Sequence, residues 1–318
     1  MFLLPHGVWK TTIGKQQGGA AEDGFFRYMQ VPGWVPGNQA LREAMIGEGL
    51  PNSRRFSRED WSRMVLQVFC KMKAGDIFKK FIYHLGYEAF FLKRISAYGY
   101  EYIVPPGNNF APWLTDDGFK AAYDLIKDHT LVDKYRCYEL WFLASQCAKV
   151  DGAVLEVGVW KGGTAGLMAK KLALMDSGKK IYLADTFAGV VKAGERDCYY
   201  KGGEHKDTSE NIARGLLGNI LGLDNFEFLV GVFPDDTARL IEESKFSFCH
   251  VDVDVYKSAK DVSEWIWPRL SVGGMIVYDD YGWIYCNGIT RFISEQIPEQ
   301  DRIILHNLNG HAVIIKIR

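Results

Sequence analysis

Short apolar runs recur along the second half of the chain, and longer polar or amphipathic segments separate them. The runs predict seven strands. The first five are each followed by a connection long enough for a crossover, which is typical of a parallel sheet covered by helices on both faces. A tight NLNG turn joins the last two, which predicts an antiparallel hairpin. The predicted strands are residues 153–157, 180–185, 226–230, 246–253, 273–279, 301–306 and 311–317.

This pattern predicts an α/β fold with a Rossmann-like parallel sheet. The C-terminal antiparallel hairpin distinguishes it from a plain dinucleotide-binding fold and favours the variant seen in class I methyltransferases. Two amphipathic stretches, 117–129 and 133–150, precede the first strand and are predicted to be helices.

The first part of the chain has a different composition and pattern. Seven of the 10 prolines lie within the first 112 residues, and they end in a cluster that breaks regular structure. We therefore divide the chain into a mainly helical or irregular extension over 1–115 and a catalytic-type domain over 116–318. Helices are predicted over 57–72 and 74–95. The many aromatic residues of the extension indicate packing, and a lid or a dimer contact is the sharper alternative.

Composition excludes several classes of protein. Lys and Arg number 38 against 39 Asp and Glu, so the chain lacks the basic excess expected of a nucleic-acid-binding protein. No apolar run reaches the ~18 residues that a membrane span requires, and the N-terminus has no basic leader of a secretory signal. The six cysteines have no zinc-ligand spacing. We expect a cytoplasmic protein with reduced thiols.

The turn after the first predicted strand reads EVGVWKGGT, residues 156–164. In doubly wound sheets this turn lies closest to the ligand, and a dinucleotide fingerprint needs a second glycine two residues after the first. Trp160 stands there instead, which argues against NAD or FAD. S-adenosylmethionine, an adenosine-type ligand without phosphate, meets the demands of this turn. The alternative is a glycine-rich turn that simply begins a helix.

Two acids accompany this turn. Glu156, at the end of the strand, is expected to take the amino-acid or ribose end of the cofactor. Asp185, at the end of the second strand, is expected to bind the ribose hydroxyls in bidentate fashion, with two-point contact. The predicted cofactor-binding residues are Glu156, Gly158, Val159, Trp160, Gly162, Gly163, Thr164, Asp185 and Asp252.

Four further carboxylates follow two neighbouring strands. The alternation of FSFCHVDVDV places Asp252 and Asp254 on one face, and the next strand ends in Asp279 and Asp280. Carboxyl ends of parallel strands meet at one edge of the sheet, so these acids are expected to converge. An oxygen-only ligand set suits Mg²⁺ or another hard divalent ion. The alternative is that the acids cap the following helices, as we expect for residues 116–117 and 235–236.

Two histidines and one loop remain open to two interpretations. His250 is expected to be a core histidine rather than a catalytic one. His205 lies in a polar loop and either contacts substrate or is solvated. The loop over 186–206 is either a flap above the active site or an ordinary surface loop.

The chain resembles the macrocin O-methyltransferase-like family (TylF/MycF type) over roughly residues 131–295. The resemblance rests on the ordered set YRCYELWFLASQCAKVDGAVLEVGVWKGGTA, ADTFAG, FEFLVGVFPD, HVDVDVYKSAKD and PRLSVGGMIVYDDYG. These are class I, metal-dependent enzymes that methylate sugar hydroxyls of antibiotics and related products. Val253 departs from the family pattern, which usually has glycine between the two acids.

The resemblance implies a role for each acid. Asp252, Asp279 and Asp280 would hold Mg²⁺, and Asp254 would be the general base. Glu156, Gly158 and Asp185 would face S-adenosylmethionine.

The implied partner is a small-molecule hydroxyl acceptor, either a glycoside or a diol, with no nucleic acid and no membrane, and the protein is expected to be a homodimer. Three other functions stay open at this point. They are a related metal-dependent enzyme that does not methylate, such as a hydroxylase-like relative, a non-catalytic scaffold, and a nicotinamide oxidoreductase, which Trp160 disfavours.

Overall fold

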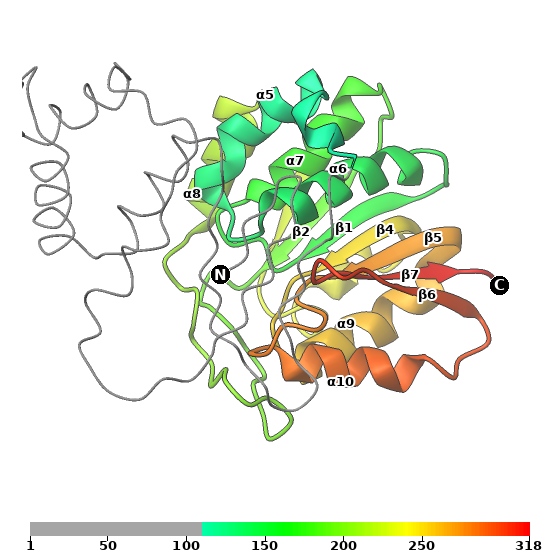
Figure 1. Cartoon of the computed structure of the whole chain (residues 1–318). Helices are drawn as coiled ribbons and strands as arrows, with labels where there is room; N and C mark the ends of the chain where they lie inside the picture. The colour runs from blue at the N-terminus through cyan, green and yellow to red at the C-terminus, as the bar shows by residue number, and fades with distance from the viewer. Residues whose placement is uncertain (1–109) are drawn as a thin grey trace, which may run out of the picture. The chain divides into compact units, whose positions relative to one another are not determined.

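One seven-stranded sheet organises the computed structural model, which describes residues 110–318 (Figure 1). The strand order is β3-β2-β1-β4-β5-β7-β6. The first five strands pair in parallel, and β7 runs antiparallel to both β5 and β6. The predicted α/β fold, with its parallel sheet and C-terminal hairpin, is confirmed. The strands are β1 (Ala153–Val157), β2 (Ile181–Asp185), β3 (Phe226–Val230), β4 (Phe246–Val251), β5 (Leu270–Tyr278), β6 (Arg302–His306) and β7 (Ala312–Lys316).

Helices cover both faces of the sheet, as Figure 1 shows. On one face α5 (Asp117–Ile126), α6 (Lys134–Cys147) and α7 (Gly163–Leu174) share an apolar core with Val154 and Phe248 of the sheet. On the other face α9 (Tyr256–Ile266) and α10 (Asn287–Gln296) pack against Leu155 and Ile276. The shorter helical segments are η1 (Pro112–Leu114), η2 (Lys127–His129), α8 (Glu210–Arg214), η3 (Gly215–Ile220), η4 (Ala238–Ile241) and η5 (Trp267–Arg269).

Aspartates fix the starts of the two helices that precede the sheet. The carboxylate of Asp116 accepts a hydrogen bond from the backbone N–H of Phe119 at 2.9 Å, as expected for a cap of α5. Asp133 caps α6 by accepting from the backbone N–H of Tyr135 at 2.8 Å. This cap fixes the first turn of α6, the helix that carries Arg136 and Glu139.

The end of β4 differs from the prediction. The strand stops at Val251, whereas the alternating pattern predicted a strand to residue 253. Asp254 adopts a left-handed backbone with φ of 63°, and the N–H of Val255 donates to the carbonyl of Val253 at 2.7 Å. The chain turns into α9 here, so Asp252 and Asp254 lie in a tight loop rather than on one strand face.

The predicted helices over 57–72 and 74–95 and the predicted extension over 1–115 lie outside the described residues, apart from the last few positions of the extension. Within residues 110–318, no helix combines the length and the apolar character that crossing a membrane would demand. The five cysteines in this part of the chain are free thiols.

Candidate active site

A cavity of about 290 Å³ opens at the carboxyl ends of β1, β2, β4 and β5. This is the edge of the sheet at which ligands bind in doubly wound folds. Most of the predicted site residues line it, whereas Glu156, Gly162 and Gly163 do not. The predicted residues in its wall are Gly158, Val159, Trp160, Thr164, Asp185, His205, Asp252, Asp254, Asp279 and Asp280.

The glycine turn brings the backbone of β1 against the loop after β4. Gly158 has a φ of 90°, and a Cβ placed on it would lie 1.7 Å from the carbonyl oxygen of Asp252. Gly163, the first residue of α7, is equally confined, because its Cβ would lie 2.6 Å from the carbonyl oxygen of His129. Only glycine allows these close approaches. The turn over 158–164 therefore presents its backbone, rather than side chains, at these two glycines; we call it the backbone cradle.

Asp185 ties the ends of β1 and β2 together. Its Oδ2 accepts from the N–H groups of Val159 at 2.6 Å and Trp160 at 2.8 Å, and its Oδ1 accepts from Phe187 N–H at 2.6 Å. A carboxylate offers about four lone-pair positions, so these bonds leave one free, on Oδ1. The expected two-point contact with ribose hydroxyls would need one backbone bond to be exchanged, and that contact stays a prediction.

Glu156 lies inside the sheet and not at the cavity. Its side chain is fully buried, and its Oε1 lies 2.7 Å from Nδ1 of His250 on β4. His250 is also fully buried, in keeping with the core histidine that the sequence predicted. The pair arises because Glu156 and His250 are register partners in the β1–β4 ladder. The proposed contact of Glu156 with the cofactor stays a prediction.

The four carboxylates converge as their strand positions require. Val251 pairs with Tyr278, so the residues that follow them, Asp252 and Asp279, leave adjacent strands side by side. One oxygen from each of Asp252, Asp279 and Asp280 lies within 4.8 Å of the other two. Asp280, like Asp254, has a positive φ, a conformation that aspartate tolerates better than most residues.

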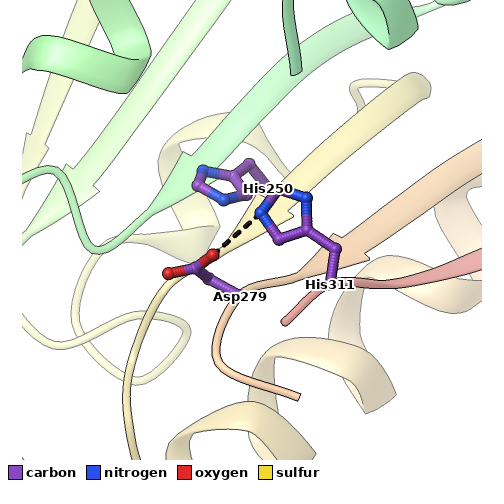
Figure 2. A group of neighbouring side chains, drawn as sticks. All are labelled: His250, Asp279 and His311. Atoms are coloured by element: carbon purple, nitrogen blue, oxygen red, sulfur yellow. Dashed lines mark ion pairs between the residues drawn. The ribbon is translucent and has the colours of Figure 1, made fainter. Parts of the chain in front are cut away.

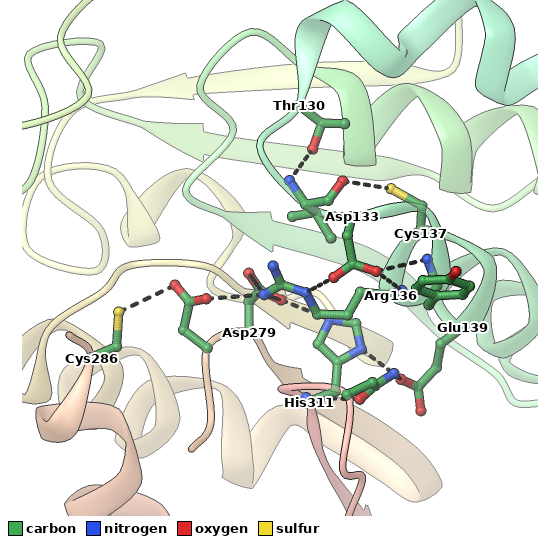
Figure 3. Close-up of polar contacts among 12 residues, drawn as sticks. Thr130, Asp133, Arg136, Cys137, Glu139, Asp279, Cys286 and His311 are labelled. Carbon is green, nitrogen blue, oxygen red and sulfur yellow. Dashed lines mark hydrogen bonds and ion pairs between the residues drawn. The ribbon is translucent and has the colours of Figure 1, made fainter. Parts of the chain in front are cut away.

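Asp279 differs from the other three acids because two cationic side chains contact it, Arg136 and His311. Nη1 of Arg136 lies 2.8 Å from both oxygens of Asp279. Nε2 of His311 lies 2.8 Å from Oδ1 of Asp279 (Figure 2). His311 and Arg136 outweigh the effect of burial and lower the pKa of Asp279 to about 2. Nδ1 of His311 meets Glu139 at 2.8 Å, and the two carboxylates raise the pKa of His311 to about 9 despite its burial (Figure 3).

The other three acids have less cationic compensation: Arg136 also contacts Asp280, at 3.0 Å from Oδ1, and no ion pair within residues 110–318 involves Asp252 or Asp254. Burial, and then the charges of Asp279 and Asp280, raise the pKa of Asp252. Burial and the charge of Asp280 raise the pKa of Asp254 to about 7, and burial with the charge of Asp279 raises that of Asp280. Buried carboxylates that repel one another create a site for a cation. Their oxygen-only ligand set meets the preference of Mg²⁺, so these residues suit that ion.

Part of the loop over 186–206 lies at the acid cluster. Gly189, Val190, Tyr200 and His205 line the cavity, and the Tyr200 hydroxyl is 3.4 Å from Nε2 of His205. The backbone of this loop is held to itself, since the N–H of Val190 donates to the carbonyl of Glu204 at 2.9 Å. The loop therefore forms one wall of the cavity.

The model of the macrocin-O-methyltransferase (TylF) family matches residues 116–302, more than half of the chain. The chain belongs to the macrocin-O-methyltransferase family. The match covers every strand from β1 to β5 and the helices between them, so the cavity and all four carboxylates fall within the family region. This agrees with the resemblance found from the motifs.

Two curated relatives of this macrocin-O-methyltransferase family member are Streptomyces enzymes. The 8-demethyl-8-(2,3-dimethoxy-alpha-L-rhamnosyl)-tetracenomycin-C 4'-O-methyltransferase of Streptomyces olivaceus is 31% identical over 48% of this chain and 62% of the relative. The demethyldecarbamoylnovobiocin O-methyltransferase of Streptomyces niveus is 32% identical over 42% of this chain and 53% of the relative. The matched part thus spans less than two thirds of either relative.

A third relative and a solved structure extend the comparison. The mycinamicin III 3''-O-methyltransferase of Micromonospora griseorubida is 28% identical over 55% of this chain and 76% of its own length. The structure of the O-methyltransferase NovP superposes with a TM-score of 0.52 and 24% identity, over 60% of this chain and 83% of that one. The superposition on NovP supports the fold.

Several residues of this family member's site were not predicted from the sequence. Arg136 reaches the acids from α6, and Glu139 and His311 meet although 172 positions separate them. Asp133, three residues before Arg136, is a residue type that commonly caps a helix, but it does not indicate that the arginine faces strand ends far away in the chain. Residues 129–132 and Trp283 also line the cavity without any motif that marks them.

Proposed function

We propose that this chain is an S-adenosylmethionine- and Mg²⁺-dependent O-methyltransferase that methylates a hydroxyl of a sugar or diol-containing natural product. One observation carries the proposal: a single cavity joins the backbone cradle at Gly158 and Asp185 to the acid cluster of Asp252, Asp254 and the 279–280 pair. The two halves match the two needs of the reaction, a bound methyl donor and an activated acceptor oxygen.

The residues divide between these two tasks. The turn over 158–164 and Asp185 would bind the methyl donor, while Asp252, Asp279 and Asp280 would hold Mg²⁺. When bound, S-adenosylmethionine supplies an electrophilic methyl group and Mg²⁺ supplies a Lewis acid that lowers the pKa of an acceptor hydroxyl. The chain itself must then align the acceptor oxygen with the methyl group and remove its proton.

Asp254 is the proposed base. It lines the cavity beside the proposed metal ligands Asp252, Asp279 and Asp280 without belonging to that set. A carboxylate in this place can serve as a general base for an acceptor hydroxyl in the same cavity. Asp254 would accept the proton from the acceptor hydroxyl as the carbon–oxygen bond forms, and the donor leaves as S-adenosylhomocysteine.

The acceptor class is supported by the relatives. The names of two of them specify methylation at the 4' and 3'' oxygens of glycosylated antibiotics. A sugar presents neighbouring hydroxyls to an acid cluster that would hold a hard cation. We therefore propose a glycoside or diol acceptor. The 116–318 domain boundary, the homodimer and the cytoplasmic location stay predictions from the sequence.

The proposal is tested by calorimetric titration of S-adenosylhomocysteine and, separately, of Mg²⁺ into the full chain. We expect one site for each. Asp280→Asn should weaken Mg²⁺ binding at least about tenfold, because one of three ligand carboxylates loses its charge, and should leave S-adenosylhomocysteine affinity nearly unchanged. Asp124→Asn on the exposed face of α5 is the matched control. Absence of S-adenosylhomocysteine binding would contradict methyl transfer, and absence of Mg²⁺ binding would contradict the metal assignment alone.

A further inference from the structure

The guanidinium of Arg136 occupies the position between two of the proposed metal ligands. Its Nη1 lies 2.8 Å from both oxygens of Asp279 and 3.0 Å from Oδ1 of Asp280 (Figure 3). These distances are those of charge-assisted hydrogen bonds. Only 13% of the arginine side chain is exposed, so this cation is a largely buried part of the site.

A divalent ion on the same ligands would need the same oxygens. Mg²⁺ binds oxygen at about 2.0–2.1 Å in a nearly octahedral shell. Arg136 contacts both oxygens of Asp279 and one oxygen of Asp280, so an ion held by Asp279 and its neighbours would take at least one oxygen that Arg136 already contacts. Two cations within a few ångströms of each other repel strongly at a site with little water. Arg136 and the metal therefore cannot both keep these contacts.

The other end of the guanidinium is tethered. Nε of Arg136 donates to Oδ2 of Asp133 at 2.8 Å, and Oδ1 of the same aspartate caps α6. Arg136 also lines the cavity. Because the side chain of Arg136 borders this cavity, its guanidinium can turn toward that space while α6 stays in place.

We propose that Arg136 is a resident counter-cation that competes with the divalent metal for Asp279 and Asp280. In the metal-free protein it neutralises part of the acid cluster and keeps the carboxylates in place, and metal binding displaces Nη1 into the cavity. The inference rests on the proposed Mg²⁺ dependence. It assigns a residue outside the ligand set that sets metal affinity.

The opposite role makes the opposite prediction. If Arg136 were a fixed organiser that holds the ligand carboxylates for the metal, removing it would weaken metal binding. If it were displaced, removing it would strengthen metal binding. Stability in chelator falls in either case, so the sign of the change in metal affinity decides between the two roles.

The experiment titrates Mn²⁺, as a probe for the hard divalent ion, into wild type and Arg136→Gln by calorimetry. Glutamine is shorter and neutral but can still donate to a carboxylate. We expect affinity to rise about tenfold, a magnitude typical of coupling between two bound species. In chelator, the melting temperature should fall by about 8 °C because a buried ion pair has lost its cation, and saturating Mn²⁺ should restore most of that loss. Arg214→Gln on α8, which removes an exposed pair with Glu210, is the matched control.

A milder variant covers the case in which Arg136→Gln fails to fold. Arg136→Lys keeps a cation but has one charged nitrogen in place of the guanidinium fork, so it cannot contact Asp133, Asp279 and Asp280 together. Its weaker hold on Asp279 and Asp280 should raise Mn²⁺ affinity about threefold, which is a smaller coupling of the same sign. Unchanged or weaker Mn²⁺ binding in the variants, with normal binding in wild type, overturns the counter-cation role and leaves the proposed function intact. Absence of Mn²⁺ binding in wild type removes the counter-cation role together with the metal assignment, and leaves methyl transfer to the S-adenosylhomocysteine titration.

Discussion

The two halves of the cavity are built on different principles. At the ends of β1 and β2 the polar groups bond to one another within the chain: backbone N–H groups donate to the carboxylate of Asp185, and glycines allow close backbone approach. At the ends of β4 and β5 they do so only in part, because four carboxylates meet one arginine and one histidine. The first half is preorganised by sterics and hydrogen bonds. The second half keeps a charge surplus, which an external cation can relieve.

The half of the cavity at the ends of β1 and β2 is most sensitive to added side-chain volume. Gly158→Ala would place a Cβ 1.7 Å from the Asp252 carbonyl at a φ that alanine avoids. We expect a loss of more than about 4 kcal/mol in the free energy of unfolding. Gly178→Ala is the control, because its φ is also positive, 64°, but no atom lies within 4 Å. Urea denaturation measures both, and equal losses would show that backbone strain alone is responsible.

The charged half is most sensitive in chemistry rather than in folding. Asp254→Asn keeps the shape of the side chain and removes the proposed base. Turnover should fall about 10³-fold, within the usual range for a general base, while S-adenosylhomocysteine affinity is unchanged. Product formation on a glycoside acceptor, followed by mass spectrometry, measures the effect. Wild-type turnover in this variant would remove Asp254 from the mechanism.

The backbone clamp at Asp185 has an intermediate effect. In Asp185→Asn one carboxylate oxygen becomes an amide that faces a backbone N–H, so at least one charge-assisted bond is lost. We expect unfolding to become easier by about 3 kcal/mol. Asp176→Asn, in the turn after α7, serves as control, and thermal melts compare the two. If Asp185→Asn proved as stable as wild type, the clamp would contribute little.

The smallest effect is a pH dependence of the charged half. Since folding raises the pKa of His311 to about 9 from an unfolded value near 6.5, its stabilising contribution is complete below pH 6.5 and disappears as pH rises through 9. In chelator we expect unfolding free energy to drop by about 2 kcal/mol across this interval. His311→Gln should flatten the curve. A wild-type curve already flat between pH 6 and 9.5 would contradict the pairing of His311 with two carboxylates.

Local patterns predicted the sheet well. Each of the seven strands has an apolar run bounded by polar or glycine-rich segments, and the NLNG turn marks the hairpin. The convergence of the acids was also predictable, because strand order places the ends of β4 and β5 together. The exact end of β4 was not, since the Val-Asp alternation continues past the point where Asp254 adopts a left-handed backbone.

Long-range partners were beyond the reach of periodicity. Nothing in α6 marks Arg136 as a partner of Asp279, which lies 143 positions away. Glu156 illustrates the converse: a strand-end acid looked exposed to ligand, yet its register partner is His250 and the pair is buried. Such contacts depend on how helices and strands pack, and a single sequence records that only indirectly.

The placement of Arg136 and Glu139 on one turn of α6 limits how this domain can be recombined with its relatives. Both face the acid cluster, one touching Asp279 directly and the other through His311. Deleting a single residue near the start of α6 would rotate the remainder of the helix by about 100° and move both side chains away. Chimeras should therefore exchange α6 as a whole with its Asp133 cap, and insertions should be placed in the loops on either side of it.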